Sequence, residues 1–408
     1  MKLAYFAPLP PKRTGVADYA AHLARALAPH VAIDFFDSAP GAAPIPGGRL
    51  IDYVARPEAI LDLPDYDAVL YQLGNNPEFH AAIFAAFQAY PGPVVLHDAV
   101  LYFLIAGLPK GGMLREFLYN HGPDRLSEFF AIERDSPSHL VLRYPQPERY
   151  KMLRRVLSLA PSLIVHSATT AALARNLGYE RRIDVIPLLA YPTAADAESP
   201  DVIAPTRQAL GLSEGDVLLG SFGFIGRTKR FSTVFAALAR LKERLRFKLL
   251  IVGEGPDLTG EIAAHGLSDD VILTGFVDEP QFGRLLRAVD VLVSLRYPSM
   301  GETSAQQIQS MACGLPSIVT DHGWFSELPD NAVWKIGVGP EEEDSLTEAL
   351  LALGQNRDRR VAMGRAARAY IAATCAPEIV ARRYLEVLGS SQHAARTFYP
   401  ATTATGAP

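Results

Sequence analysis

The sequence is poor in cysteine, since its 408 residues include only Cys313 and Cys375. One pair in a chain of this length is no disulfide framework, so the composition favours a reducing compartment. The sequence also lacks any run of the roughly 20 apolar residues that a membrane-spanning helix needs. We therefore expect a cytoplasmic protein without a transmembrane segment. The composition leaves peripheral contact with the inner face of a membrane open.

An excess of positive charge is also missing. The chain has 39 Lys and Arg residues against 44 Asp and Glu, a formal net charge of −5. General nucleic-acid binders usually show a strong basic excess, so we expect no nucleic-acid partner. Hydrophobic residues make up 49% of the sequence, and the length suits two domains that each bury a core.

Short apolar runs alternate with stretches of helical periodicity, which predicts parallel sheets covered by helices on both faces. The run Met1–Phe6 ends before Pro8, is too short for a signal peptide, and is typical of a first strand. In the first half we expect strands at Leu3–Phe6, Ala32–Phe36, Ala68–Gln72, Val94–His97, Leu163–His166 and Asp184–Pro187.

A proline-rich region from about Pro187 to Pro205 interrupts the alternation, and we expect an interdomain linker at residues 191–206. The alternation then restarts, with strands expected at Val217–Phe222, Lys248–Val252, Val271–Thr274, Val291–Leu295 and Ser317–Thr320. The predicted fold class is α/β, with two Rossmann-like, doubly wound domains at residues 1–190 and 207–375 facing an interdomain cleft. Ligands then lie beyond the carboxyl ends of the strands. Residues 390–408 are expected to form a flexible tail.

The first candidate site follows the first strand, where a helix is predicted to begin near Gly15. A glycine turn at a helix N-terminus offers free backbone N–H groups to an anionic or polar ligand. Asp18 lies in the first turn of this helix and is a candidate to contact an acceptor substrate, the molecule to which a group is transferred. An ordinary strand-to-helix turn, with Asp18 as a first-turn acid, explains the same residues equally well.

Polar residues also follow other strands of the first half. His97 ends an apolar strand, and a histidine there can donate to a sugar hydroxyl or accept a proton. His166 closes another strand in a similar way. Asp98 and the pair Asn75 and Asn76 are candidates for the acceptor side, although the two asparagines are equally compatible with turn chemistry.

A glycine-rich, basic turn follows the first strand of the second half. Gly226 lets the backbone approach a ligand, and Arg227, Lys229 and Arg230 place cations beside it. A departing diphosphate needs such groups because charge accumulates on its oxygens. A solvated basic turn is the structural alternative.

The segment Gly301–Ser304 opens a helix that Gly314 and Pro316 end. Thr303 or Ser304 is expected to cap this helix, with Gln306 or Gln307 completing a capping box. Glu302 lies outside the cap, where a carboxylate can bind sugar hydroxyls while the helix N-terminus faces a phosphate.

No metal site is expected. Asp65-Tyr66-Asp67 has the Asp-x-Asp form that holds a divalent ion in other sugar transferases, but it precedes a strand and so lies at the wrong end of the sheet. The sequence has no Cys/His cluster with zinc spacing.

Taken together, these residues resemble the family-four retaining glycosyltransferases of the GT-B fold, from Leu3 to about Leu388. The second half carries the more specific match, and the Gly-Glu-Thr-Ser form of the donor motif is similar to a branch that acts on bacterial surface polysaccharides. The matching segments are Gly226–Lys229, Leu250–Pro256, Thr274–Val277, Ala288–Val291 and Met311–Pro316.

The resemblance implies a role for each matching residue. It assigns the diphosphate to Lys229 with help from Arg227, the sugar to His97 and Glu302, and the nucleobase to the backbone of Phe276 and Val277. It further implies that Thr303 and Ser304 face the diphosphate, that the Gly15 turn contacts donor phosphate or acceptor, and that a helix at residues 376–389 crosses back to the first domain.

Two positions depart from the family pattern. Phe224 stands where the family usually has an arginine, five residues before Lys229. Gln309 stands where the family has a second glutamate that binds the ribose, and an amide can still hydrogen-bond a hydroxyl there.

The resemblance implies a metal-independent hexosyltransferase without a cofactor. It would move a sugar, such as mannose, from a nucleotide diphosphate to a saccharide or lipid-linked acceptor, with retention at the anomeric carbon. Two alternatives stay open: a sugar-nucleotide epimerase or hydrolase of the same fold, and a non-catalytic sugar-nucleotide-binding partner.

Overall fold

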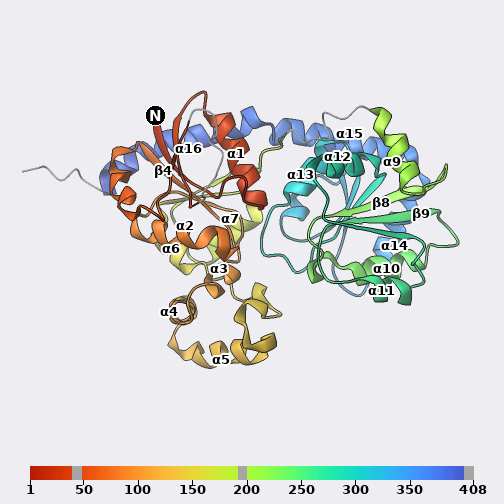
Figure 1. Cartoon of the computed structure of the whole chain (residues 1–408), viewed down its shortest axis with the longest axis horizontal. Helices are drawn as coiled ribbons and strands as arrows, with labels where there is room; N and C mark the ends of the chain where they lie inside the picture. Colours follow the sequence, from red (N-terminus) through yellow and green to blue (C-terminus); the bar gives the residue numbers. More distant parts are fainter. Residues whose placement is uncertain (39–47, 192–199, 399–408) are drawn as a thin grey trace, which may run out of the picture. The chain divides into compact units, whose positions relative to one another are not determined.

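The computed structural model describes residues 1–38, 48–191 and 200–398 of the chain, with the backbone alone for 390–398. The chain divides into two compact units. Unit 1 comprises Met1–Leu189, Met300–Thr303 and the segment from Pro377, and unit 2 comprises Ala190–Ser299 and Ser304–Ala376. In both units a parallel sheet lies between helices (Figure 1).

The sheet of unit 1 has seven parallel strands in the order β3-β2-β1-β4-β5-β6-β7. The order reverses between β1 and β4, which makes the carboxyl ends of these strands the expected place for a ligand. All six residues of β4 are buried, as expected for a central strand covered on both faces. The strands are β1 Lys2–Phe6, β2 Ala32–Phe36, β3 Arg49–Ile51, β4 Ala68–Leu73, β5 Val94–Leu96, β6 Ser162–Val165 and β7 Arg182–Val185.

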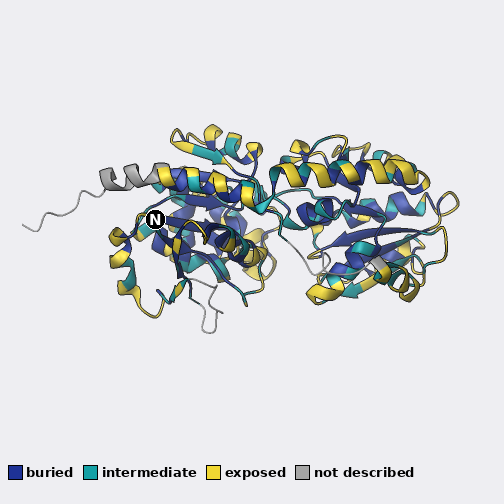
Figure 2. Cartoon of the chain, turned by 90° about the horizontal axis from the view of Figure 1, so that it is seen from above, coloured by how far each residue is buried: buried dark blue, intermediate teal, exposed yellow. Residues whose placement is uncertain are grey.

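The helices of unit 1 turn apolar faces to this sheet and expose their polar faces (Figure 2). Helix α1 shows the pattern, since Tyr19, Leu23 and Leu27 recur at helical spacing and are all buried. The α-helices are α1 Gly15–Leu27, α2 Pro77–Ala89, α3 Tyr102–Ala106, α4 Lys110–His121, α5 Leu126–Asp135, α6 Arg154–Leu159, α7 Ala168–Asn176 and α16 Pro377–Phe398. Short 3₁₀ helices are η1 Pro57–Asp65, η2 Pro123–Arg125, η3 Pro137–His139, η4 Val141–Arg143 and η5 Pro147–Arg149.

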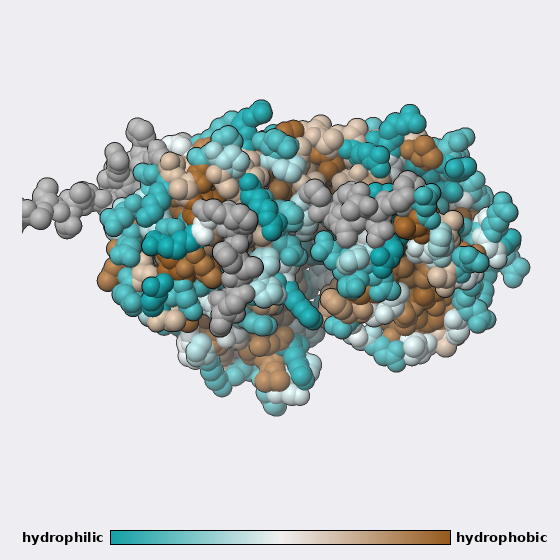
Figure 3. Space-filling model, turned by 45° about the horizontal axis from the view of Figure 1, so that its top comes forward, coloured by the Kyte–Doolittle hydropathy of each residue, from teal (hydrophilic) through white to brown (hydrophobic). Residues whose placement is uncertain are grey.

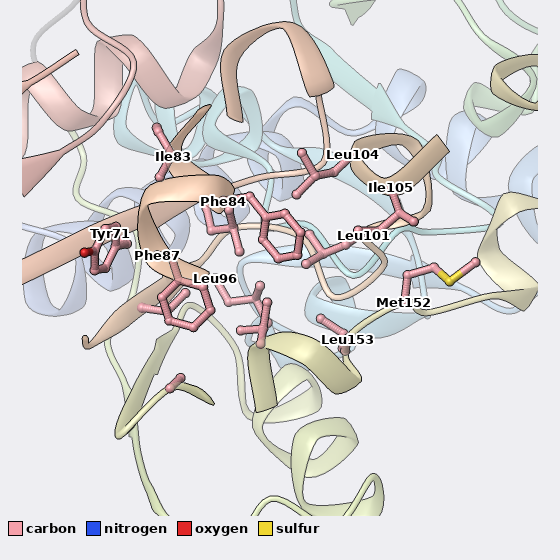
Figure 4. Close-up of a cluster of buried hydrophobic side chains, with 14 of the residues drawn as sticks. Tyr71, Ile83, Phe84, Phe87, Leu96, Leu101, Leu104, Ile105, Met152 and Leu153 are labelled. Atoms are coloured by element: carbon pink, nitrogen blue, oxygen red, sulfur yellow. The ribbon is translucent and has the colours of Figure 1, made fainter. Parts of the chain in front are cut away.

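The core of unit 1 continues beyond the sheet. Figure 4 shows Phe84 of α2 near Leu101, with Phe87, Met152 and Leu153 in the same cluster. All five side chains are almost fully buried. This part of the core joins the sheet to the helices α3–α6, which are inserted between β5 and β6.

Unit 2 has six parallel strands in the order β10-β9-β8-β11-β12-β13. Its strands are β8 Val217–Phe222, β9 Phe247–Val252, β10 Val271–Gly275, β11 Val291–Ser294, β12 Ser317–Thr320 and β13 Val333–Ile336. Its α-helices are α9 Ile203–Ala209, α10 Phe231–Ala239, α11 Thr259–Ala264, α12 Glu279–Ala288, α13 Ala305–Ala312, α14 Glu342–Gln355 and α15 Arg357–Thr374. Its 3₁₀ helices are η6 Pro200–Val202, η7 Arg227–Lys229 and η8 Gly323–Glu327.

The predicted α/β class and both Rossmann-like halves are confirmed, and every predicted strand is present within two residues of its expected ends. Two short edge strands escaped prediction. β3 has only three residues, and β13 pairs only with β12. In the sequence, neither stands out as a continuous apolar run.

Several predicted boundaries need correction. The linker expected at 191–206 ends earlier, because η6 and α9 begin at Pro200 and Ile203. Pro205 is compatible with α9 because it lies in the first turn, where its missing N–H has no partner to lose. Residues 192–199 of that linker lie outside the described part.

The C-terminal helix is longer than the expected 376–389, because α16 runs to Phe398 and no proline or glycine follows Gly389 within it. It belongs to unit 1, where it packs on α1 and β4. Of the tail predicted to be flexible, residues 390–398 are therefore helical and 399–408 lie outside the described part. No helix of the described residues is both long and apolar enough to cross a membrane. Apolar atoms reach the surface in separate patches among hydrophilic ones (Figure 3).

Candidate active site

Two histidines meet beyond the ends of β5 and β6 in unit 1. His97 Nδ1 lies 3.3 Å from His166 Nε2. The outer ring nitrogens face protein oxygens: His97 Nε2 lies 2.7 Å from Gln72 Oε1, and His166 Nδ1 lies 2.8 Å from the Ile186 carbonyl oxygen. All four ring nitrogens are thus within hydrogen-bond distance of a protein atom. The expected contact between His97 and a sugar stays a prediction, and it requires one of these bonds to open.

The charge of this pair follows from counting hydrogens. Three contacts connect Ile186, His166, His97 and Gln72, while two neutral imidazoles supply only two N–H groups. The side-chain amide of Gln72 supplies the third hydrogen when its NH₂ group faces His97. In the structure the Gln72 NH₂ group instead donates to the Tyr5 hydroxyl at 2.9 Å, so this arrangement requires the amide to be turned over, with the Tyr5 hydroxyl then donating to the amide oxygen. Gln72 therefore allows the pair to remain uncharged without an unsatisfied contact.

Burial opposes protonation of these rings. It lowers the pKa of His166 to about 4, and together with the neighbouring His166 and His80 it lowers the pKa of His97 well below its usual range. It also lowers the pKa of His80 to about 4. The polar centre of unit 1 is consequently neutral at pH 7.

The C-terminal helix reaches this centre through tyrosines. The ring of Tyr19 on α1 contacts both His97 and His166 edge-on, with centroid separations of 5.2 and 5.4 Å. Its hydroxyl lies 2.8 Å from the hydroxyl of Tyr384 on α16, and both side chains are buried. The docking of α16 thereby helps to fix the histidine rings.

Gly15 begins α1 as expected, after a turn that Asp37 fixes. The carboxylate of Asp37 accepts the Leu9 N–H at 3.0 Å and pairs with Lys12. A Cβ atom on Gly15 would meet no atom within 4 Å, so the space above the first turn is open and a ligand can approach the backbone closely. Asp18 is exposed on the same turn.

The three residues predicted to contact an acceptor, Asn75, Asn76 and Asp98, all form hydrogen bonds within the protein. Asn76 caps α2 by accepting the Glu78 N–H at 2.9 Å. The Asn75 side chain accepts the N–H groups of Phe103 and Leu104 at the start of α3. Asp98 accepts the Asn75 N–H at 2.8 Å. These contacts favour the turn-chemistry interpretation of Asn75 and Asn76, and their role toward an acceptor stays a prediction.

The predicted donor turn is divided between the two units. Met300–Thr303 belongs to unit 1, so the expected domain 207–375 is interrupted. The cause is local packing: the Met300 carbonyl accepts the Val100 N–H at 2.9 Å, and the Met300 side chain joins the core of unit 1. Gly301 has φ 77°, and a Cβ there would lie 2.3 Å from the Ala99 Cβ. The turn therefore needs glycine.

Glu302 follows at the surface of this turn and is half-buried. Its carboxylate accepts the Met300 N–H at 2.7 Å, which closes the turn. The Thr170 hydroxyl donates to the Gly301 carbonyl at 3.2 Å from α7. Thr303, the last residue of the segment, is also half-buried. Contact of Glu302 and Thr303 with a donor stays a prediction.

In unit 2, three loops at the carboxyl ends of β8, β9 and β10 are joined through glycines. The Gly223 N–H donates to the Val252 carbonyl at 2.9 Å, and the Gly253 N–H donates to the Gly275 carbonyl at the same distance. All three glycines have positive φ angles, and a Cβ on Gly253 would lie 2.2 Å from the Gly223 oxygen. Such close backbone approach leaves the rim of the sheet without bulky side chains at these positions.

Lys229 lies under this rim. Its side chain is 5% exposed, and its ammonium group donates to the Phe222 carbonyl at 2.6 Å. The Lys229 N–H donates to the Gly226 carbonyl at 2.9 Å, which shapes the turn η7. Arg227 of the same turn is exposed. A cation held this way is already desolvated and oriented before a ligand arrives.

The residue after Lys229 is held by an ion pair that the sequence did not reveal. Arg230 has φ 57°, a left-handed conformation that costs a non-glycine residue about 1–2 kcal/mol. Its guanidinium group forms two hydrogen bonds with the carboxylate of Glu342, which is 3% exposed at the start of α14. This pair raises the pKa of Arg230 and secures the strained backbone beside Lys229.

Helix α13 begins at the predicted place. Ser304 is the N-cap, and its hydroxyl oxygen accepts the Gln307 N–H at 3.2 Å. The capping box is not completed, because the Gln307 amide donates to the Ser317 hydroxyl instead. Gln309 is 6% exposed, and within the described residues its Nε2 finds no hydrogen-bond partner. An unsatisfied buried donor favours the prediction that Gln309 meets a ligand hydroxyl.

Two aromatic side chains stand on the joined loops of unit 2. Phe224 is 73% exposed and Phe276 is 61% exposed. Phe224, at the position of the expected arginine, contributes no charge. Val277 is half-buried and packs against the core, and the contact of Phe276 and Val277 with a base stays a prediction.

The Asp-x-Asp segment has a structural role at the other end of the first sheet. Asp67 accepts the Lys2 N–H at 2.8 Å, at the amino end of β1. Across the described part of the chain, no three His, Cys, Asp or Glu side chains gather in a way that could hold a metal ion.

Comparison with known proteins agrees with this geometry. Residues 202–370 match the family model "Glycosyl transferases group 1". This part of the chain is similar to the group 1 glycosyl transferases. It contains Lys229, Arg230, the joined glycine loops and α13, and therefore most of the features described in unit 2.

The alignments with curated relatives include only part of this chain and part of each relative. The chain is 32% identical to the 2-deoxystreptamine glucosyltransferase of Streptomyces kanamyceticus over 36% of its own length and 39% of the relative's. It is 24% identical to the lipopolysaccharide core biosynthesis mannosyltransferase LpsB of Rhizobium meliloti, over 53% of its own length and 72% of the relative's. The chain thus spans about two fifths of the first of these relatives.

Solved structures extend the likeness over both units. The crystal structure of Anabaena HepE in complex with UDP-glucose superposes with a TM-score of 0.67 at 16% identity, covering 96% of this chain and 100% of that one. Sucrose-phosphate synthase from Thermosynechococcus elongatus gives a TM-score of 0.66 at 18% identity, covering 97% and 100%. The fold is therefore GT-B, as predicted.

Sequence reasoning missed several residues of these two centres. The sequence could have indicated Gln72, since it is a polar residue inside an apolar strand. Glu342 and Tyr384 carried none, because their partners Arg230 and Tyr19 lie 112 and 365 positions away.

Proposed function

We propose that this protein is a glycosyltransferase that moves a hexose from a nucleotide diphosphate sugar to a saccharide or lipid-linked saccharide acceptor. The single observation that carries the proposal is Lys229, a buried ammonium group beside a rim of glycine loops in the part of the chain that is similar to group 1 glycosyl transferases. A departing diphosphate is the kind of ligand that such a cation and bare backbone suit. The names of the relatives, a glucosyltransferase and a mannosyltransferase, support a hexose as the transferred group.

We further propose retention at the anomeric carbon. The bond between the anomeric carbon and the diphosphate oxygen breaks, and the acceptor oxygen bonds to the same face of the sugar. The acceptor proton passes to the departing phosphate. In this scheme Lys229 and the N-terminus of α13 stabilise the charge on the leaving group, and catalysis needs no covalent intermediate and no metal.

The two units support different parts of this scheme. The charged groups of unit 2 suit the diphosphate, and the unsatisfied Gln309 amide suits a ribose hydroxyl. The neutral histidine centre of unit 1 suits sugar hydroxyls, which carry no charge. We propose a cytoplasmic enzyme of surface polysaccharide or glycoconjugate synthesis.

The test begins with thermal denaturation of the full chain in the presence of UDP-glucose, GDP-mannose and the free nucleotides. A bound donor at 100 times its dissociation constant should add about 2.7 kcal/mol of stability. The stabilising donor is then incubated with saccharide acceptors, and the anomeric configuration of the product is read by NMR. Inversion of configuration would overturn the retaining mechanism.

Products without an acceptor separate the alternatives. Release of free sugar at the same rate with and without acceptor would indicate a hydrolase, and a changed sugar on the nucleotide would indicate an epimerase. Donor binding without turnover across the acceptor panel would indicate a non-catalytic binding partner.

A further inference from the structure

The connection between β5 and β6 is much longer than the others in unit 1. It holds the helices α3–α6 and the turns η2–η5, which we call the lobe (residues 102–160). In Figure 1, α4 and α5 stand away from the sheet of unit 1. Leu104, Ile105 and Met152 anchor the base of the lobe in the core of unit 1 (Figure 4).

A pocket of about 360 Å³ opens in this outer part. That volume is within the range of small-ligand sites. The Tyr102 hydroxyl donates to the Val141 carbonyl at 2.9 Å and holds one wall in place. The wall is mostly apolar, with Ala106, Leu108, Met113, Phe129, Leu140, Val141 and Leu142, and the polar lining residues are Lys110, Glu133, His139 and Arg143.

The polar lining leaves one cation available. Lys110 is neutralised by Glu133, with Nζ and Oε1 2.9 Å apart. Arg143 is exposed, and its guanidinium group has no ion-pair partner among the side chains of residues 1–38, 48–191 and 201–389. An arginine in this state suits a phosphate oxygen, with which it can form two parallel hydrogen bonds.

Exposed apolar side chains are also concentrated in the lobe. Thirteen large apolar side chains of the described residues are exposed, and four of them fall between positions 126 and 142. These four are Leu126, Phe130, Leu140 and Leu142, which are 39%, 53%, 50% and 46% exposed. Leu140 and Leu142 also line the pocket, so the apolar surface continues from outside to inside. A ligand dissolved in water would not require the outer half of this surface.

The charge of the lobe differs from that of the chain. Residues 102–160 contain nine Lys and Arg against six Asp and Glu, whereas the whole chain contains 39 against 44. Apolar side chains among a surplus of cations are complementary to the surface of an anionic bilayer.

The lip of the pocket is also strained. Ser138 and His139 have consecutive left-handed backbones, with φ 58° and 52°. Such a conformation costs about 1–2 kcal/mol for each non-glycine residue, and it persists where the surrounding structure holds it. Here the Ser136 carbonyl accepts the His139 N–H at 2.9 Å, and the strained turn brings His139 and Leu140 into the pocket lining.

We propose that the lobe binds an anionic lipid at a membrane surface. The apolar chain enters the pocket between Leu108, Phe129 and Leu142, and the lipid phosphate pairs with Arg143 beside His139. Leu126 and Phe130 contact the surrounding acyl layer. Binding of the lipid is independent of sugar transfer, and only its use in bringing a lipid-linked acceptor to the enzyme rests on the proposed function.

The experiment is co-sedimentation of the full chain with vesicles of phosphatidylcholine alone, or with about one fifth phosphatidylglycerol, at low and raised salt. We expect binding to the anionic vesicles that weakens as salt rises. Arg143→Ala should weaken it about fivefold, the effect of one basic residue near an anionic surface. Leu142→Ser should also weaken it, and thermal denaturation checks that both variants fold.

Matched controls use exposed residues of unit 1 outside the lobe. Leu61→Ser removes a side chain that is 78% exposed, and Arg56→Ala removes an exposed cation. Equal losses in the control and lobe variants would overturn the proposal, as would equal binding to both kinds of vesicle. Displacement by inorganic phosphate beyond that by chloride of equal ionic strength would indicate a soluble anion instead of a lipid. Since no donor or acceptor is present, failure here leaves the proposed transferase activity untouched.

Discussion

The buried polar centres of the two units have opposite electrostatic characters. In unit 1, His97, His166 and Gln72 form a closed set of hydrogen bonds in which burial keeps the imidazoles neutral. In unit 2, burial encloses full charges, with Lys229 5% exposed and Glu342 3% exposed. Both sets lie at the carboxyl ends of parallel strands or on the helices beside them.

The difference shows how one architecture can prepare two kinds of binding surface. A neutral network binds hydroxyl groups without requiring a counter-ion, whereas a desolvated ammonium group gains most from an anionic partner. Unit 2 retains its charges because each has an oxygen or a guanidinium group within hydrogen-bond distance. The following predictions test this contrast, beginning with the largest expected effect.

Replacing the buried cation of unit 2 should have the largest effect. Lys229→Ala should lower kcat by about 10²–10³-fold, the usual consequence of removing one group that stabilises a leaving anion. Steady-state kinetics with the donor identified above measures this loss. Lys248→Ala, which removes a cation from β9 of the same unit, is the control. Full activity of the Lys229 variant would show that the Lys229 ammonium group does not stabilise the leaving group.

The neutral centre of unit 1 should respond to acid. Because the folded-state pKa of His166 is about 4, below its ordinary value near 6.5, the unfolded chain takes up the proton first as the pH falls. The stabilisation is complete above pH 6.5 and is lost as the pH falls toward 4. Over this window the loss should be about 3 kcal/mol for this histidine. Chemical denaturation at several pH values measures it.

A variant in which residue 166 cannot ionise makes the same test more specific. His166→Asn should flatten the dependence of stability on pH between about 6.5 and 4. His30→Asn, at an exposed position, should leave that dependence unchanged. A slope that is identical in the wild type and the His166 variant would show that His166 is not the neutral group assumed here.

The ion pair beside Lys229 should contribute a moderate stability effect. Glu342→Gln should lower the free energy of unfolding of unit 2 by about 2 kcal/mol, because it weakens a charge-assisted bidentate contact to Arg230. The adjacent Glu343 pairs with Arg240 at the surface, so Glu343→Gln should cost less than about 0.5 kcal/mol. Equal effects would mean that burial of Glu342 has no special role.

The smallest effect on stability is expected at Gly15. Gly15→Ala adds a methyl group to open space, so stability should change by less than about 1 kcal/mol. Turnover should nevertheless fall about tenfold, or 1.4 kcal/mol of barrier, because the methyl group keeps a ligand from the helix N-terminus. Gly111→Ala is the control, since a Cβ there also meets nothing within 4 Å. Unchanged turnover would show that Gly15 has a structural role and no role in binding the ligand.

Much of the fold was predictable because its signals are local. The strands β8 and β12 begin and end where their apolar runs do, and α1 begins at Gly15. The N-cap Ser304 and the end of α13 just before Gly314 follow from capping chemistry that operates within four residues. The edge strands β3 and β13 were missed because short or polar-interrupted runs carry little signal.

The candidate sites were predictable in part. Lys229 and Gly15 were selected because a cation or a glycine after a strand can face a ligand, and their contacts with a donor stay predictions. Asn75 and Asn76 illustrate the limit, since caps and ligand contacts need the same residue types. Residues elsewhere in the chain determine whether such a side chain is already hydrogen-bonded within the protein or can still bind a ligand.

By itself, the sequence determined the α/β class, the two sheets and the loops at which chemistry is expected, since strand and helix periodicity act over a few residues. Only the tertiary structure decided the partners of those loops. It joined His97 to His166 and Arg230 to Glu342, and it drew Met300–Thr303 out of the second half of the sequence into unit 1. These pairings depend on packing between segments far apart in the chain, and packing leaves no periodic trace in either segment.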